Sequence, residues 1–153
     1  MNIIKICFLL IVLNFLQAQN IDLYLSLIEE GNSKGVKDNI AELISKYPKD
    51  PGILYLDALL TEDGESAVKQ YKNIIKNHSD SKYVPDSAMK LGEYFYARGL
   101  YTQSANLLKN IPERYPRYKD MQRLTDLMIN SFRAIGEADS ANYYGLIIKS
   151  MFP

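Results

Sequence analysis

Few side chains in this sequence could perform catalysis. His78 is the only histidine, and it stands in a polar stretch beside Asn77 and Ser79. A zinc centre or a histidine-based triad would need further ligands or partners around such an imidazole. Cys7 is the only cysteine, and it lies in an apolar segment near the first residue. We therefore expect His78 to be an exposed turn residue, and we expect no enzyme, no cofactor and no metal site.

Neighbouring acidic residues are the next candidates for chemistry. Glu29 and Glu30 are adjacent, and Asp63 and Glu65 flank Gly64. Adjacent residues on a helix point about 100° apart, so their carboxylates do not converge on one substrate atom. We interpret these acids as solvated helix ends. The segment 31–36 contains two glycines but lacks the Gly-Lys-Ser/Thr ending of a phosphate-binding loop.

Residues 114–119 form the one cluster of basic and aromatic residues, Arg-Tyr-Pro-Arg-Tyr-Lys. Interleaved arginine and tyrosine can stack on bases and neutralise phosphates. The chain as a whole has 18 basic and 18 acidic residues, so no general attraction to polyanions is expected. We expect no nucleic-acid partner. Contact of this cluster with a lipid headgroup or an acidic protein stays open.

The first 19 residues are typical of a secretory signal peptide. Lys5 supplies a positive start, residues 6–13 are apolar, and Ala18 offers a cleavage point. An uncleaved anchor is the alternative. Cys7 stands too early, behind bulky residues, to be a lipidation site. We expect a signal peptide over 1–19, a folded domain over 20–153, and export to the periplasm or the outer membrane of a bacterium, with peripheral membrane association as an option.

The sequence contains a repeat, and its helices should determine where these side chains lie. Three glycines are each followed seventeen residues later by a proline with an aromatic residue before it: Gly31 with Tyr47-Pro48, Gly99 with Tyr115-Pro116, and Gly136 with Phe152-Pro153. Glycine fits the left-handed residue that ends one helix, and proline stops the next helix. A fixed interval of this kind indicates tandem helical hairpins.

Apolar residues at helical spacing complete the pattern. We expect helices over about 20–30, 33–47, 53–60, 64–77, 85–98, 102–111, 120–135 and 139–152, with Ser33, Asp120 and Asp139 as N-caps. Pro112 should kink the sixth helix or end it near Asn110. The predicted fold is all-α, an α-solenoid of about four helix-turn-helix repeats.

The third repeat resembles a tetratricopeptide repeat, on Ala88, Leu91-Gly92, Phe95, Gly99, Ala105 and Tyr115-Pro116. The fourth keeps Phe132, Gly136 and Ala141 but has Met128-Ile129 in place of Leu-Gly. The segment 80–92 is similar to exported bacterial members, such as the coordinator of the Tol–Pal system and the tetratricopeptide lipoprotein of the outer-membrane β-barrel assembly machinery. The resemblance implies a scaffold that binds a protein or peptide partner in the cell envelope.

In such an array the first helix of each repeat lines the concave face. Side chains of those helices that the core does not need should contact the partner, and we assign this role to Met89, Glu93, Tyr96, Arg123, Asn130 and Arg133. The alternative for Met89 and Tyr96 is that they complete the packing between neighbouring helices. A second functional class is self-association, as a homo-oligomer or within a larger envelope assembly, through an apolar edge of the last repeat at Tyr143, Leu146 and Ile147.

Overall fold

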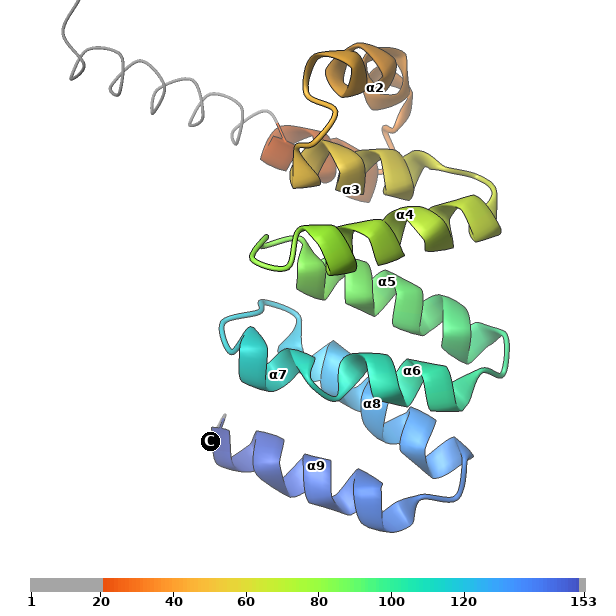
Figure 1. Cartoon of the computed structure of the whole chain (residues 1–153), viewed down its shortest axis with the longest axis vertical. Coiled ribbons are helices and arrows are strands. Elements are labelled where there is room, and N and C mark those ends of the chain that lie inside the picture. Colours follow the sequence, from red (N-terminus) through yellow and green to blue (C-terminus); the bar gives the residue numbers. More distant parts are fainter. Residues whose placement is uncertain (1–20, 152–153) are drawn as a thin grey trace, which may run out of the picture. The chain divides into compact units, whose positions relative to one another are not determined.

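A computed structural model describes residues 21–151 (Figure 1), and the predicted signal peptide at 1–19 lies outside that range. The described chain is all-helical and contains no strand, which confirms the all-α prediction. None of its helices combines the length and the apolar character that crossing a bilayer requires. It divides into two compact units, one ending at Glu62 and the other beginning at Asp63.

The first unit contains a helix over residues 21–29, α2 (Lys34–Lys46) and α3 (Pro51–Leu60). Helices α2 and α3 pack against each other. The Asp50 carboxylate begins α3, because it accepts the backbone N–H groups of Gly52 at 2.9 Å and Ile53 at 3.1 Å. Lys37 donates to Glu62 at 2.8 Å, which ties α2 to the end of the unit.

The second unit is larger and carries all six predicted partner-binding residues. It consists of α4 (Gly64–Asn77), α5 (Val84–Ala97), α6 (Tyr101–Leu108), α7 (Ile111–Arg114), α8 (Met121–Ala134) and α9 (Ala138–Met151). Each of α4, α5, α6 and α8 packs on the next long helix in the sequence, and α5 also packs on α8. Figure 1 shows these helices following one another from green α4 to blue α9.

The three repeat glycines end their helices in one and the same way. Gly31, Gly99 and Gly136 have φ angles of +80°, +72° and +78°. The N–H of Gly99 donates to Tyr96 O at 3.0 Å, and the N–H of Leu100 donates to Phe95 O at 2.8 Å. The same two bonds occur after the helices that precede Gly31 and Gly136. This is the Schellman motif, and it confirms the expected left-handed turns.

An offset of 37 residues relates the second helices of the last three hairpins. With this offset Ile74, Ile111 and Ile148 align with one another, and all three are buried. It also matches His78 to Tyr115, which have nearly the same backbone angles at the ends of α4 and α7. His78 thus takes the place of a repeat tyrosine and is half-buried, whereas the sequence predicted an exposed turn residue.

The helix ends differ from the predictions in detail. Helix α6 stops at Leu108 and α7 begins at Ile111, which confirms the break before Pro112. Ser33 and Asp120 stand at N-cap positions, but their side chains make no capping bond. Asp139 is wrong as a cap because it lies inside the first turn of α9. The carbonyl of Glu137 accepts the N–H of Ala141, so the helix begins two residues earlier than it would with Asp139 as its N-cap.

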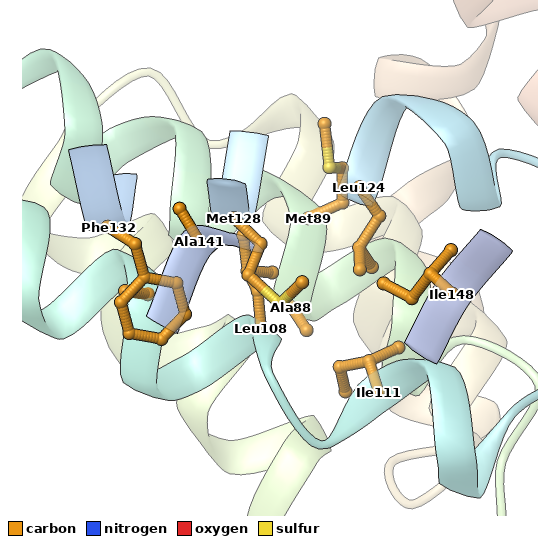
Figure 2. Packing of buried hydrophobic residues seen from close by; sticks show 10 residues of the cluster. Ala88, Met89, Leu108, Ile111, Leu124, Met128, Phe132, Ala141 and Ile148 are labelled. Atoms are coloured by element: carbon orange, nitrogen blue, oxygen red, sulfur yellow. The ribbon is translucent and has the colours of Figure 1, made fainter. Parts of the chain in front are cut away.

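The core of the second unit is assembled from α5, α6, α7, α8 and α9. Figure 2 shows its apolar side chains, among them Leu108, Leu124 and Met128, which are fully buried. Gly92 lets α5 and α6 approach closely, since a Cβ at Gly92 would stand only 3.0 Å from Leu108 Cδ1. The buried Ser104 hydroxyl donates to the Gly92 carbonyl at 3.1 Å across the same contact.

Candidate binding surface

The six predicted partner-binding residues come from two helices in contact, α5 and α8. The structure brings two of them together directly, because the Arg123 guanidinium of α8 donates to the Glu93 carboxylate of α5. Lys90 Nζ lies 3.7 Å from the other oxygen of Glu93. The Arg123 side chain remains 64% exposed, so the pair lies at the surface and stays accessible to a partner.

Asn130 and Arg133 extend this surface along α8, and both are exposed. Asn130 follows Arg123 by seven residues, or two helical turns, so the two side chains share a face. Asp126 is also exposed and accepts a hydrogen bond from Gln122 at 2.9 Å. The sequence interpretation did not include Asp126. The 37-residue offset from Met89 would have pointed to this position.

Met89 does not belong to the exposed surface. It is 5% exposed and lies in the core cluster beside Leu124 (Figure 2). Tyr96 is half-buried, and its ring stands edge-on to that of Tyr101 with a centroid distance of 5.0 Å. The packing alternative therefore holds for Met89, whereas Tyr96 both packs on α6 and keeps an accessible part.

The basic-aromatic cluster at 114–119 separates into two roles. Tyr115 donates its hydroxyl to the Ser79 carbonyl, and Tyr118 donates to Asp86 at 3.1 Å. Burial, followed by the charge of Asp86, raises the pKa of Tyr118 well above its ordinary value. The two tyrosines therefore connect the segment to the turn after α4 and to α5. Arg117 and Lys119 are exposed.

The exposed side chains of this surface can form hydrogen bonds and ion pairs. Within residues 21–151 no three histidine, cysteine or acidic side chains gather where they could hold a metal ion. Arg123, Asn130 and Arg133 can donate to the carbonyls and carboxylates of a peptide, and Glu93 can accept. Exposed ion pairs of this kind contribute only about 0–1 kcal/mol to folding.

Comparison of the chain with protein-family models, with curated proteins and with solved structures gives no match. The resemblance to tetratricopeptide repeats therefore stays a prediction that rests on the residues named above.

Proposed function

We propose that the protein is a non-catalytic scaffold, an α-solenoid of tetratricopeptide-like hairpins that holds a protein partner in a bacterial cell envelope. The partner would bind the concave surface, defined here as Glu93, Tyr96, Arg123, Asn130 and Arg133. Met89 is left out because the core buries it. Three Schellman turns at corresponding glycines and the buried isoleucines at 37-residue intervals support the repeat.

The ion pair between Glu93 and Arg123 is the observation that carries this proposal. It joins the first helices of two successive hairpins on the side where Asn130 is exposed. Polar and charged side chains that lie together on two neighbouring helices form a surface that can bind an extended peptide. Arginine and tyrosine are also the residues that most often dominate protein–protein binding.

Site-directed crosslinking in envelope fractions tests the proposal. A photoreactive residue at Asn130 should give one dominant adduct, which unlabelled protein should compete away. Asn106 is the matched control, since it is an exposed asparagine on α6, outside the concave surface. Adding Arg133→Glu with Tyr96→Ala should abolish the Asn130 adduct while circular dichroism stays that of a folded helical protein. Equal adducts at Asn130 and Asn106, or none at Asn130, would contradict the assignment of the concave surface as the partner-binding site.

Export is part of the proposal and rests on residues 1–19 alone. The mature chain would begin near Gln19 and carry no cysteine. Fractionation of cells, followed by mass spectrometry of the intact protein, should find the processed chain in the periplasm or with the outer membrane. A full-length chain recovered from the cytoplasm would contradict export, but it would leave the binding surface untouched.

Self-association is the second candidate, and one comparison between helices favours it. Tyr143 and Leu146 of α9 are 60% and 70% exposed. The 37-residue offset matches Tyr143 to Asn106 and Leu146 to Lys109, and the same positions of α4 hold lysines. A face that is polar on two helices is thus apolar on the third. Exposed apolar side chains grouped in this way are typical of interaction sites.

The variant that restores the residues of α6 tests this second candidate. Tyr143→Asn with Leu146→Lys removes the apolar face without touching the core, because both side chains are exposed. If α9 mediates self-association, the wild type should sediment as an oligomer and the double variant as a monomer. A wild type that stays monomeric at high concentration would exclude the homo-oligomer.

A further inference from the structure

A groove of about 600 Å³ lies between α8, α9 and the segment that precedes α8. Its floor is formed by Thr125 and Ile129 of α8 and by Gly145 and Ile148 of α9. Arg117, Lys119 and Lys149 stand at its rim. The groove is separate from the concave surface defined above, since it shares none of that surface's residues.

The corresponding groove of the preceding hairpin is occupied by a helix. The 37-residue offset takes Thr125 to Ala88, Gly145 to Leu108 and Ile148 to Ile111. Those three residues are buried in the core cluster together with Leu124 and Met128, which α8 contributes. Hairpin α5–α6 thus presents this surface to a helix. Among the residues that the structure describes, no helix follows α9 to cover the same surface of hairpin α8–α9.

One exchange changes the floor of the groove. Leu108 of α6 packs over Gly92 in the preceding hairpin, whereas Ile129 of α8 packs over Gly145 here, so the large apolar side chain comes from the other helix. The Thr125 side chain adds a polar feature, since it is 4% exposed and its hydroxyl has no hydrogen-bond partner. Buried hydroxyls are nearly always paired in proteins, so a single polar side chain set within an otherwise apolar partner surface would satisfy this one.

The rim indicates the charge of a complementary partner. Arg117, Lys119 and Lys149 are all exposed and positive, and Asp126, which accepts a bond from Gln122, is the one acidic residue that lines the groove. We propose that the groove between α8 and α9 binds an amphipathic helix of a partner protein, whose apolar stripe enters the groove and whose flanking aspartates and glutamates meet the basic rim. Complementary charge sets the orientation and excludes basic helices.

Two synthetic helical peptides test this proposal. Both copy the apolar face of α8, namely Leu124, Met128 and Phe132, because α8 is the helix that fits the equivalent groove. One peptide carries glutamate at its remaining exposed positions and the other carries lysine. Fluorescence anisotropy with the full mature chain should show the acidic peptide binding at least about tenfold more tightly. Its affinity should fall as salt is added.

Variants of the chain locate the binding site. Arg117→Glu with Lys149→Glu should abolish the preference for the acidic peptide, and both positions are exposed, so the fold should persist. Gly145→Leu, which installs the residue of the preceding hairpin, should block binding of either peptide. Lys76→Glu on α4 is the control and should change nothing. In methyl NMR spectra, the signals of Ile129 and Ile148 should shift when the acidic peptide is added.

Three outcomes would overturn the proposal. Binding of neither peptide would exclude a helix-binding groove. Equal binding of both would remove the role of the basic rim. Loss of binding in Arg133→Glu, with binding retained in the variant that carries Arg117→Glu and Lys149→Glu, would place the peptide-binding site on the concave surface. The last result would support the proposed scaffold function while rejecting the groove, so the two proposals fail separately.

Discussion

Ile129 of α8 packs over Gly145 of α9, with Ile129 Cδ1 3.5 Å from the point where a Cβ on Gly145 would stand. The preceding hairpin has the reverse arrangement, in which Leu108 of α6 packs over Gly92 of α5. The 37-residue offset matches Ile129 to Gly92 and Gly145 to Leu108. The large and the small residue have therefore exchanged helices, and both hairpins keep a close approach at this contact.

The two glycines should respond in opposite ways to alanine. A methyl at Gly92 would stand 3.0 Å from Leu108 Cδ1 and 3.2 Å from its Cγ, and Leu108 is fully buried. We expect Gly92→Ala to lower the free energy of unfolding by about 1–3 kcal/mol. Gly145→Ala meets only ordinary contact and gains helix propensity, so it should raise that free energy by up to about 1 kcal/mol. Urea unfolding followed by circular dichroism measures both, and effects of equal sign would contradict the exchange.

The left-handed glycines give a second prediction. Gly99 and Gly136 have φ angles of +72° and +78° and no atoms within 4 Å of a built Cβ. Alanine there meets backbone strain alone, which costs about 1–2 kcal/mol per residue. Gly35 of α2 is the matched control, because its Cβ would also point into open space but its φ is not positive. We expect Gly35→Ala to leave thermal stability unchanged or to raise it.

The parts of the fold that were predictable from the sequence depend on local signals. A left-handed glycine ends a helix whatever surrounds it, and Pro112 lacks the N–H that would continue α6. The helix ranges and the three Schellman turns follow from such residues. Asp139 shows the limit of this approach, since Glu137 and Asp139 both stand near the start of α9 and it is the Glu137 carbonyl that accepts the N–H of Ala141.

The parts that were not predictable depend on contacts between helices distant in the chain. Met89 and Glu93 are four residues apart on α5, yet one is buried against α8 and the other pairs with Arg123 at the surface. Hydrophobicity left both interpretations of Met89 open. The replacement of Leu-Gly by Met128-Ile129 looked like a departure from the repeat, and only the position of Gly145 explains it.

Alkaline pH should destabilise the protein through its buried tyrosines. Burial, followed by the charge of Glu93, raises the pKa of Tyr71 from 10.0 to about 12. Between these values the unfolded chain has lost the phenolic proton and the folded chain keeps it, so the unfolded state binds fewer protons and stability falls as pH rises. One such group contributes at most about 1.4 kcal/mol per pH unit. Urea unfolding at a series of pH values from 9 to 12 measures how steeply the free energy of unfolding falls with pH.

Phenylalanine variants assign that slope. Tyr71→Phe should make the fall in stability above pH 10 less steep, since it removes one proton that differs between the two states. Tyr118→Phe should act in the same direction, because burial and Asp86 also raise the pKa of Tyr118. It should cost some stability at neutral pH through loss of the 3.1 Å bond to Asp86. A slope that Tyr71→Phe leaves unchanged would contradict the burial of its hydroxyl.

Pro112 should be the sole cause of the break between α6 and α7. The 37-residue offset matches Pro112 to Ile75 and to Lys149, and the helices that contain those residues, α4 and α9, run without interruption. In Pro112→Ala the new N–H can donate to the Leu108 carbonyl, so α6 and α7 should join into one helix. Amide hydrogen exchange of residues 109–113 should then slow, and helical ellipticity should rise. Ile75→Pro is the converse variant and should break α4 at the same point, at a cost of about 3 kcal/mol. If exchange in Pro112→Ala stayed as fast as in the wild type, packing of Ile111 in the core would be the cause of the break instead.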